Sequence, residues 1–327
     1  MIFLLFSISV NGYSAYYIGI TDSLFFNRIE VKLKSEVKSQ SGDFLGDIRT
    51  GYNYPGGTYI SIDRASFKIY VKDFQFLLGK DRIPWGFGYF YSPGDLVNPE
   101  YSPLDPERIE EGVEMIDISF RRSQSTSLEF ILLPAQKAHR IIVPDDIRIG
   151  GRIYVFTNSF ESYLSLMKKN EYILSTGIRK DYLGYILYGE LKSTINALSR
   201  FSSLMGINKT LYNNFYVNLE YFHNGDGITT TEYDSLQNIG RLHINPGYTG
   251  KNYLYTGLSY SRDEGFGFGF YSIYSIDWES FISVASITYT GIKDATFYLY
   301  GIYASNDREF GDLGFRKSLV INVKFFF

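Results

Sequence analysis

Charged and apolar residues alternate along residues 28–38 of the chain. One set of positions holds Arg28, Glu30, Lys32, Lys34 and Glu36, and the intervening set holds Ile29, Val31, Leu33 and Val37. Successive side chains of a β-strand point to opposite faces of the sheet, so this spacing predicts a strand with one charged and one apolar face. Such a strand borders water on one side and a core or lipid on the other.

The same period of two returns along most of the chain. It is clear in residues 64–72, 116–121 and 214–221, and residues 265–270 read Gly-Phe-Gly-Phe-Gly-Phe. Many of these segments run for about 9–12 residues, the length that a tilted strand needs to cross a bilayer. Strands of a soluble sandwich average about five or six residues. The pattern therefore favours membrane-spanning strands over a soluble sandwich.

Short clusters of Gly, Asn and Asp separate the predicted strands, as in residues 224–227 and 291–294. Brief connections of this kind suit hairpins joined up and down. So many strands in one open sheet would leave exposed edges, and closure into a barrel removes them. We predict an all-β fold, a transmembrane antiparallel up-and-down β-barrel of about 16 strands within a range of roughly 14–18. Residues 15–327 would form it as a single domain.

Residues 1–14 are predicted to be a signal peptide. Ile2–Val10 form a short apolar run, which is followed by small and polar residues up to Ala15. The run is too short to span a membrane as a helix and fits the apolar core of an export signal, with cleavage after Ser14. The alternative is that this segment forms a first barrel strand or a buried strand.

Composition narrows the chemistry of the chain. Tyr (30) and Phe (27) raise the aromatic content to 18%, a bias typical of strands. The net charge of −3 gives no footprint for nucleic acid, so no nucleic-acid partner is expected. The absence of cysteine excludes disulfides, iron–sulfur clusters and thiol catalysis. No cofactor and no metal are expected, because no His, Asp and Glu cluster has metal-ligand spacing.

The C-terminal segment Ser318–Phe327 also alternates. Its apolar face holds Leu319, Ile321, Val323, Phe325 and Phe327. This segment resembles the closing strand of bacterial outer-membrane proteins, which ends in an aromatic residue with apolar residues at alternate positions before it. The resemblance implies that these five residues are an assembly signal read by the barrel-assembly machinery. It also implies a location in the outer membrane and contact with its lipid.

Three longer segments interrupt the strand pattern: Ile83–Glu111, Pro134–Arg148 and His223–Asn252. Long connections in a barrel lie outside the cell or fold into the lumen. The first follows the sequence Leu78-Gly-Lys-Asp-Arg-Ile-Pro-Trp-Gly86 and continues through a Pro- and Asp-rich stretch to Arg108. It is similar to the porin-like group that includes phosphate-selective porins and capsule-assembly or alginate-export barrels, and this resemblance implies a channel.

The strand count conflicts with an extracellular position for that first loop. Counted from the sequence, it follows the fourth strand, which would put it on the periplasmic side. Either one strand is missing from the count or the loop is not extracellular, and we favour a missing strand because strand boundaries are the least certain feature of a sequence.

The charges of Lys80–Glu111 predict a constriction. Three basic residues stand against seven acidic ones, a net charge of −4, and acidic rings at a narrow point favour cations. The constriction candidates are Arg82, Asp95, Asp105, Glu107 and Arg108. The lumen-facing candidates are Arg28, Glu30, Lys32, Lys34 and Lys68. Two alternatives stay open: a solvated surface loop, and an anion pore in which lumen Lys and Arg side chains dominate.

The function predicted from these features is a porin-like channel for passive diffusion of small hydrophilic solutes or ions, and a homotrimer is an assembly that fits it. The alternatives are a structural, adhesive or polysaccharide-export barrel. An outer-membrane hydrolase is less expected, because His139, His223 and His243 lie in the long loops with no marked nucleophile nearby. We therefore expect no catalytic residues and no enzyme.

Overall fold

The computed structural model describes residues 7–22, 24–100, 102, 111–123, 125–134, 147–195, 197–212, 214–238, 245, 247–305, 308–311 and 316–327. This part of the chain contains eighteen strands and two short helices. They are β1 (Ser7–Thr21), β2 (Phe25–Lys38), β3 (Gly42–Tyr54), β4 (Gly57–Val71), β5 (Phe74–Asp81), β6 (Val113–Ser123), β7 (Thr126–Leu133), β8 (Arg148–Phe156), β9 (Glu161–Lys168), β10 (Tyr172–Tyr182), β11 (Tyr185–Thr194), β12 (Ala197–Leu211), β13 (Phe215–His223), α1 (Thr230–Asn238), β14 (Asn252–Tyr260), β15 (Phe266–Ser275), β16 (Ser280–Ile292), β17 (Ala295–Ala304), α2 (Arg308–Gly311) and β18 (Lys317–Phe326).

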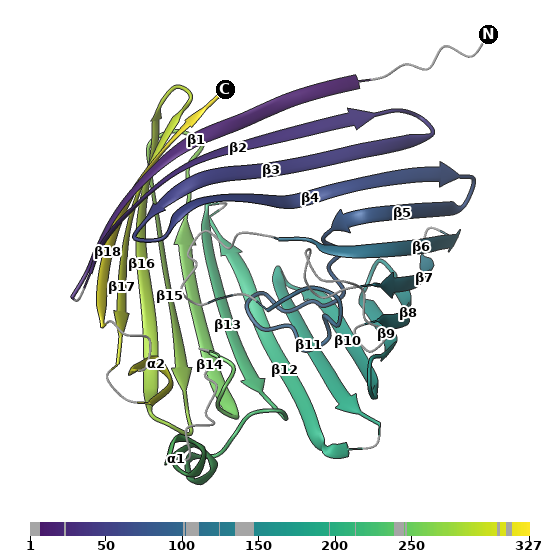
Figure 1. Cartoon of the computed structure of the whole chain (residues 1–327). Coiled ribbons are helices and arrows are strands. Elements are labelled where there is room, and N and C mark those ends of the chain that lie inside the picture. Colours follow the sequence, from purple (N-terminus) through teal and green to yellow (C-terminus); the bar gives the residue numbers. More distant parts are fainter. Residues whose placement is uncertain are drawn as a thin grey trace.

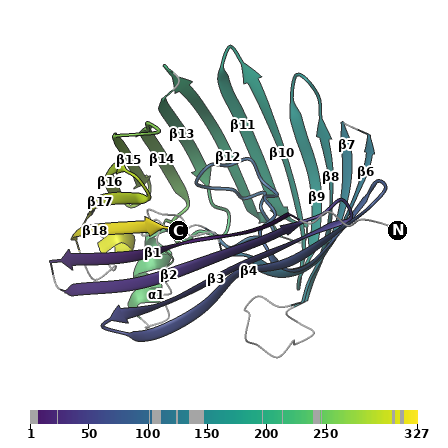
Figure 2. The ribbon, with the colours of Figure 1, turned by 90° about the horizontal axis from the view of Figure 1, so that it is seen from above.

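The strands form one closed antiparallel barrel (Figure 1). Each strand pairs with the next along the chain, and β1 pairs with β18, for example Ile18 with Ile321. Seen from above, the strands form a ring around an interior that one connecting segment enters (Figure 2). The predicted all-β up-and-down barrel is confirmed, with eighteen strands at the upper end of the predicted range rather than about 16.

The long connections gather at one end of the barrel. The strands that flank the connections 82–112, 134–147, 224–251 and 305–316 all meet these connections at the barrel end where Figure 1 shows α1 and α2, opposite to Ser7 and Phe327. At the end with the termini, no connection exceeds five residues by the strand bounds. The first long connection follows the fifth strand, so the strand count from sequence was one short before this loop. Its position therefore agrees with that of the other long loops.

Strand β1 begins inside the segment that is predicted to be a signal peptide. Its residues from Ser7 to Gly12 pair with β2, whereas its pairing with β18 begins at Tyr13. The backbone of Gly12 also exchanges two hydrogen bonds with that of Phe327. Cleavage after Ser14 stays a prediction.

The outer surface of the barrel is apolar, and on β2 and β18 the inward side chains are polar. On β2, Ile29 is 52% exposed and Leu33 47%, whereas Glu30 between them is fully buried. On β18, Leu319 and Ile321 are likewise exposed while Asn322 is buried. A soluble sandwich would bury its apolar side chains, whereas a bilayer requires an apolar outer belt. In these strands the alternation of the sequence thus sorts apolar side chains outward and polar ones inward.

None of the helices in the described part of the chain is long and apolar enough to span a membrane.

Candidate functional site

The segment between β5 and β6 turns into the barrel and crosses its inner wall. We call its residues 82–100 the inner loop. Trp85, Leu96 and Val97 pack against inner side chains of β5, β6, β7 and β9, and all three are almost completely buried. Farther along the wall, Tyr89 contacts Tyr216 of β13 and Tyr255 of β14. The inner loop therefore extends along the inner wall from β5 to β14.

The carboxylate of Glu190, on the inner face of β11, binds the inner loop at two places, one before and one after residues 89–91. It accepts hydrogen bonds from the backbone N–H groups of Phe87 and Gly88, and from that of Gly94 at 3.0 Å. The hydroxyl of Ser92 donates to it as well, at 3.1 Å. A Cβ on Gly94 would overlap the Tyr163 hydroxyl, so only glycine allows this close approach.

Glu220 does the same for the three residues in between. Its carboxylate, on the inner face of β13, accepts hydrogen bonds from the backbone N–H of Tyr89, and from those of Phe90 at 3.0 Å and Tyr91 at 3.1 Å. The Tyr188 hydroxyl donates a fourth at 2.7 Å. Charge-assisted hydrogen bonds of this kind are roughly twice as strong as neutral ones. Two carboxylates thus fix the course of the inner loop through its backbone.

Two arginines of β8 hold the two flanks of the inner loop. Arg152 donates to the carbonyl oxygen of Pro84 at 3.1 Å and stacks over the Trp85 ring, while it pairs with Glu129. Arg148 donates to the carbonyl oxygen of Leu96 at 3.0 Å. These contacts give two loop carbonyls side-chain donors and tie both flanks of the inner loop to β8.

A third buried carboxylate fixes a different long connection in the same way. Glu309 of α2 is fully buried and accepts a hydrogen bond from the backbone N–H of Thr249 at 3.0 Å, in the connection between β13 and β14. The Tyr253 hydroxyl donates to the same carboxylate. Burial raises the pKa of Glu309 to about 7, because the ionised form has lost its hydration.

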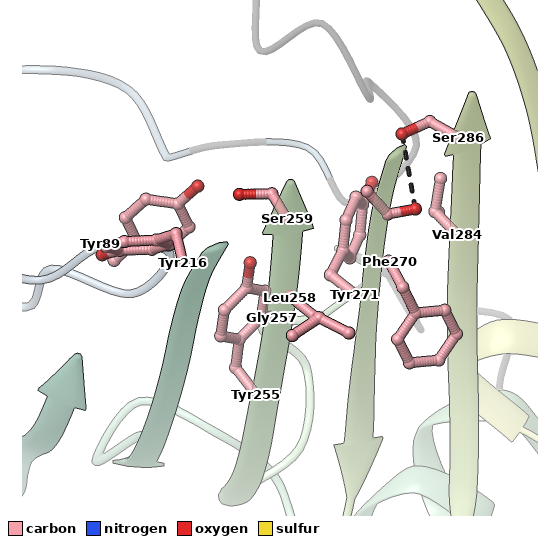
Figure 3. A pocket seen from close by; sticks show the side chains of 11 residues that line it. Tyr89, Tyr216, Tyr255, Gly257, Leu258, Ser259, Phe270, Tyr271, Val284 and Ser286 are labelled. Atoms are coloured by element: carbon pink, nitrogen blue, oxygen red, sulfur yellow. Dashed lines mark hydrogen bonds between the residues drawn. The ribbon is translucent and has the colours of Figure 1, made fainter. Parts of the chain in front are cut away.

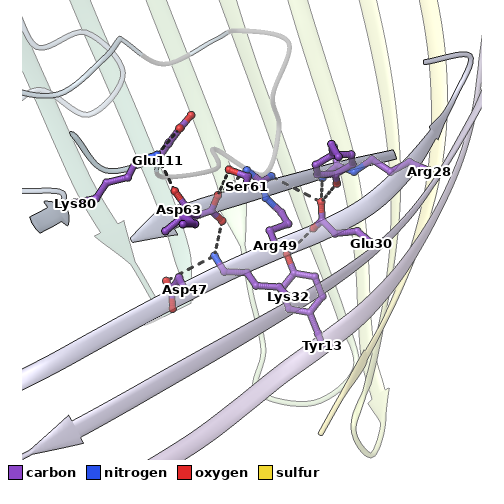
Figure 4. Close-up of polar contacts among 12 residues, drawn as sticks. Tyr13, Arg28, Glu30, Lys32, Asp47, Arg49, Ser61, Asp63, Lys80 and Glu111 are labelled. Carbon is purple, nitrogen blue, oxygen red and sulfur yellow. Dashed lines mark hydrogen bonds and ion pairs between the residues drawn. The ribbon is translucent and has the colours of Figure 1, made fainter. Parts of the chain in front are cut away.

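The opposite part of the inner wall carries paired charges (Figure 4). Glu30 accepts hydrogen bonds from the Tyr13 hydroxyl at 3.0 Å and the Tyr59 hydroxyl at 2.6 Å, and it forms an ion pair with Arg28. Arg49 bridges Glu30 and Asp63, with nitrogen–oxygen distances of 3.7 and 2.9 Å. We call the residues of β2–β4 joined in this way, Arg28, Glu30, Lys32, Asp47, Arg49 and Asp63, the charged wall.

The charges of the charged wall balance. Lys32 lies 3.3 Å from Asp63 and 3.8 Å from Asp47, so three cations stand against three anions. Two of the carboxylates, Glu30 and Asp63, are fully buried. Buried carboxylates without partners would be costly, and the bridging cations offset that cost. The charged wall therefore presents closely spaced ion pairs with no net charge to the interior of the barrel.

The predicted lumen-facing residues all lie on β2 or β4. Arg28, Glu30 and Lys32 belong to the charged wall, Lys68 pairs with Asp81 at 3.3 Å, and Lys34 stands opposite Asp47 in the strand register. Their role in permeation stays a prediction.

The predicted constriction residues lie in or beyond the inner loop. Asp95 accepts hydrogen bonds from the backbone N–H groups of Val97 and Asn98, at 3.1 and 3.0 Å, and so stabilises a turn of the loop. The backbone N–H of Arg82 donates to Asp81 at 2.8 Å. Asp105, Glu107 and Arg108 lie outside the described residues.

The histidines weighed for catalysis are only partly covered by the structure. His139 and His243 lie outside the described residues. A ring nitrogen of His223 lies 2.9 Å from the side-chain oxygen of Asn252, while Asp226 pairs with Lys192 at 3.1 Å. Asn252 therefore orients His223, and Asp226 is engaged elsewhere.

Sequence reasoning missed Glu190 and Glu220. Each is the single acidic residue of its strand, within Tyr-Ile-Leu-Tyr-Gly-Glu-Leu-Lys-Ser-Thr of β11 and Phe-Tyr-Val-Asn-Leu-Glu-Tyr-Phe-His of β13. A lone carboxylate on the inner face of a strand with no other acidic residue was the available signal. A buried carboxylate needs donors, and the alternation alone identifies its face.

Comparisons with known proteins give matches at the level of structure. No protein-family model and no curated protein matches the sequence. OccK5 (OpdH) of Pseudomonas aeruginosa matches with a TM-score of 0.63 at 10% identity, over 98% of this chain and 97% of that one. OccD3 (OpdP) of the same organism gives 0.60 at 12% identity, over 98% and 91%.

A triple mutant of the Rhodopseudomonas blastica porin matches with a TM-score of 0.52 at 11% identity, over 98% of this chain and all of that chain. These identities are too low to carry over a function. The structural matches cover almost the whole chain, however, and they agree with the closed ring of antiparallel strands. The chain therefore has the fold of a porin-like β-barrel.

Proposed function

We propose that this chain is an outer-membrane channel for passive diffusion of small hydrophilic solutes or ions. The observation that carries the proposal is the inner loop, which Glu190 and Glu220 hold across the inner wall by its backbone. A segment fixed inside a barrel narrows the interior and leaves polar side chains to line what remains. The apolar outer belt supports a position in lipid.

The distribution of connections supports an orientation in that membrane. Barrels of this kind have short periplasmic turns and longer extracellular loops. The end with α1, α2 and the long connections would then face outward, and both chain termini would lie on the periplasmic side. Solutes would enter past the long loops and meet the inner loop on their way.

Single-channel recording tests the proposal. The full chain, refolded in detergent and shown to be folded by its heat-modifiable migration, is added to a planar bilayer. Discrete and reproducible conductance steps are the expected result. A folded barrel that inserts and gives no steps would refute the channel, and would instead agree with a plugged structural or adhesive barrel.

A further inference from the structure

Four consecutive strands of the barrel carry no charge. Strands β14, β15, β16 and β17 contain no Asp, Glu, Lys or Arg, although β2, β3 and β4 carry all members of the charged wall. We call these four strands the neutral wall. Their inner face is built from Tyr, Ser, Thr, Gly and aliphatic residues, as the register Gly257–Tyr271–Val284 and Ser259–Gly269–Ser286 illustrates. The interior is therefore divided into a charged and an uncharged sector.

A pocket of about 200 Å³ lies where the inner loop meets the neutral wall (Figure 3). This space is more than ten times what one water molecule needs. None of the described residues that line it carries a charge. Its lining consists of Tyr89, Tyr216, Tyr255, Gly257, Leu258, Ser259, Gly269, Phe270, Tyr271, Val284 and Ser286.

Tyrosine rings form the sides of this pocket. Tyr89, 39% exposed on the inner loop, has its ring centre 5.5 Å from that of Tyr216 and 6.0 Å from that of Tyr255. The rings of Tyr255 and Tyr271 stack with centres 6.1 Å apart. The hydroxyl of Ser259 points toward Tyr89 and Tyr216 (Figure 3). Flat rings and hydroxyls thus meet around one space.

Glycines keep the pocket open. A Cβ on Gly269 would come within 2.7 Å of the Ser286 hydroxyl, and one on Gly257 would come as close to the Tyr255 hydroxyl. Both are tighter than ordinary van der Waals contact, so any larger side chain would take up space now open between the tyrosines. Glycine in a strand interior weakens the strand and marks a place where something approaches the backbone closely.

The chemistry of the lining selects against ions. Glu220 pairs with the lining residue Tyr255 in the strand register, and its carboxylate is occupied by backbone N–H groups of the inner loop and by Tyr188. A charged solute entering here would lose hydration without meeting a free opposite charge. A neutral ring with hydroxyl groups at its edge and C–H groups on its face would stack on the phenol rings and exchange hydrogen bonds with Tyr and Ser hydroxyls.

We propose that this pocket is a binding subsite for a neutral hydroxylated ring, that is, a sugar. The subsite rests on the proposed channel function, because it would hold such a solute on its passage through the pore. Its recognition elements are the rings of Tyr89 and Tyr216 and the hydroxyls of Ser259 and Ser286.

D-Glucose and sorbitol are a matched pair of probes for this subsite. Both are neutral six-carbon polyols, but sorbitol is acyclic and has no rigid ring face. Glucose should reduce single-channel conductance with a saturable concentration dependence, whereas sorbitol should change it only as far as it changes the bulk solution. Calorimetric titration of the detergent-solubilised full chain measures the same binding without requiring conductance.

The variant Tyr216→Leu removes one ring and should raise the half-saturating glucose concentration about tenfold. Tyr298→Leu is the control, because Tyr298 also points into the barrel, from β17, and is not part of the pocket lining. Gly269→Leu fills the pocket from a second side and should have the same effect as Tyr216→Leu if that variant does not fold.

The outcomes separate the subsite from the channel. A conducting barrel that treats glucose and sorbitol alike overturns the subsite and leaves the channel standing. Glucose binding by calorimetry in a barrel without conductance refutes the channel and keeps the pocket. Equal effects of Tyr216→Leu and Tyr298→Leu, or absence of effect from Gly269→Leu, would also remove the subsite.

Discussion

At the scale of single residues, the course of the loops inside the barrel depends on buried carboxylates. These carboxylates accept hydrogen bonds from backbone N–H groups in place of water. Glu190, Glu220 and Glu309 are at most 1% exposed, and each accepts at least one hydrogen bond from a loop backbone. The desolvation cost of a buried carboxylate is large, and several donors are needed to offset it. These side chains therefore determine where loops attach, although Glu190 and Glu220 lie on strands and only Glu309 lies in a connection.

Replacing Glu220 with Gln should loosen the inner loop. The amide keeps one acceptor oxygen but turns an N–H₂ group toward backbone N–H donors, and a hydrogen bond to a charged group contributes about 1.5–3 kcal/mol. We expect larger and noisier conductance steps and faster proteolysis within residues 82–100, in a barrel that still folds. Glu264→Gln, in the exposed turn between β14 and β15, is the control. Unchanged conductance in Glu220→Gln would mean that this carboxylate does not hold the loop in the pore.

The ion pairs of the charged wall should stabilise the folded barrel. Arg49→Met should leave Glu30 and Asp63, both fully buried, without their shared cation. Breaking a buried pair costs about 3–5 kcal/mol when the remaining charge has no other partner, and the cost here should be smaller because Glu30 keeps Arg28 and Asp63 keeps Lys32. Lys38→Met breaks a pair with Glu36 whose two side chains are 59% and 31% exposed, and it should have a far smaller effect. Denaturant unfolding followed by heat-modifiable migration compares the two variants, and equal midpoints would contradict the argument.

At the scale of elements, each strand follows from a local pattern, which is why the sequence predicts the strands well. The period of two is visible in β2 without knowledge of any partner strand. Eighteen strands exceed the predicted number of about 16 because some strands, such as β7 and β9, have only eight residues, and because β1 begins within the segment that is predicted to be a signal peptide. Pairing with a strand far along the chain, as of β1 with β18, comes from closure and not from either sequence alone.

Strand β18 carries the assembly prediction. Phe327 is 64% exposed and follows the exposed residues Leu319, Ile321 and Phe325 of the outer face, while its backbone pairs with Gly12. Phe327→Asp should impair insertion into the outer membrane while synthesis and export continue, because a carboxylate would interrupt that apolar face. Phe327→Leu should insert normally. A normal amount of heat-modifiable Phe327→Asp barrel in the membrane would contradict the assembly role.

Helix α2 should hold its neighbouring connection in a pH-dependent way. The pKa of Glu309 is raised to about 7, above its ordinary value of 4.5. A carboxyl with a raised pKa stabilises the folded form fully below its ordinary pKa, and that contribution is lost as the pH rises toward 7. Hydrogen exchange around Thr249 should therefore be slower at pH 5 than at pH 8, after correction for the intrinsic rate. Glu309→Gln should flatten this difference, and an unchanged difference would assign it to another group.

At the scale of the whole molecule, the barrel could be predicted but the arrangement of its interior could not. Phe87 and Glu190 are 103 residues apart in sequence, and Tyr89 and Glu220 are 131 apart. Contacts between residues so far apart produce no periodic pattern in either segment. The apolar outer belt, in contrast, produces the alternation that is visible in the sequence. The charge of the loop was readable from its residues, but the use of Asp95 as a turn-stabilising acceptor required the fold.

Ion selectivity is the property of the whole pore that the sequence addresses. The charged wall is balanced, so the net charge of −4 in Lys80–Glu111 is the larger bias, and we expect modest cation selectivity. Reversal potentials in a salt gradient measure it. The preference should shrink as salt rises, because charges are screened over about 10 Å at 0.1 M.

Neutral variants test the origin of that selectivity. Asp95→Asn, Asp105→Asn and Glu107→Gln together should move the reversal potential toward anions. Asp263→Asn with Glu264→Gln, at the opposite end of the barrel, should leave it nearly unchanged. An anion-selective wild type would instead assign selectivity to the Lys and Arg side chains of β2 and β4.

The attachment of the inner loop has a consequence for how this protein can evolve. Glu190 and Glu220 contact main-chain nitrogens of five consecutive residues, Phe87 to Tyr91, and none of these contacts depends on which side chain is present. Gly88, which has no room for a Cβ, and the buried Phe90 and Tyr91 are fixed by packing, but descendant sequences can exchange the exposed Tyr89, and with it the solutes that pass, while the path of the loop is inherited unchanged. Proline is the exception, since it has no N–H to donate. A library randomised at the exposed Tyr89 should yield many functional pores and exclude proline.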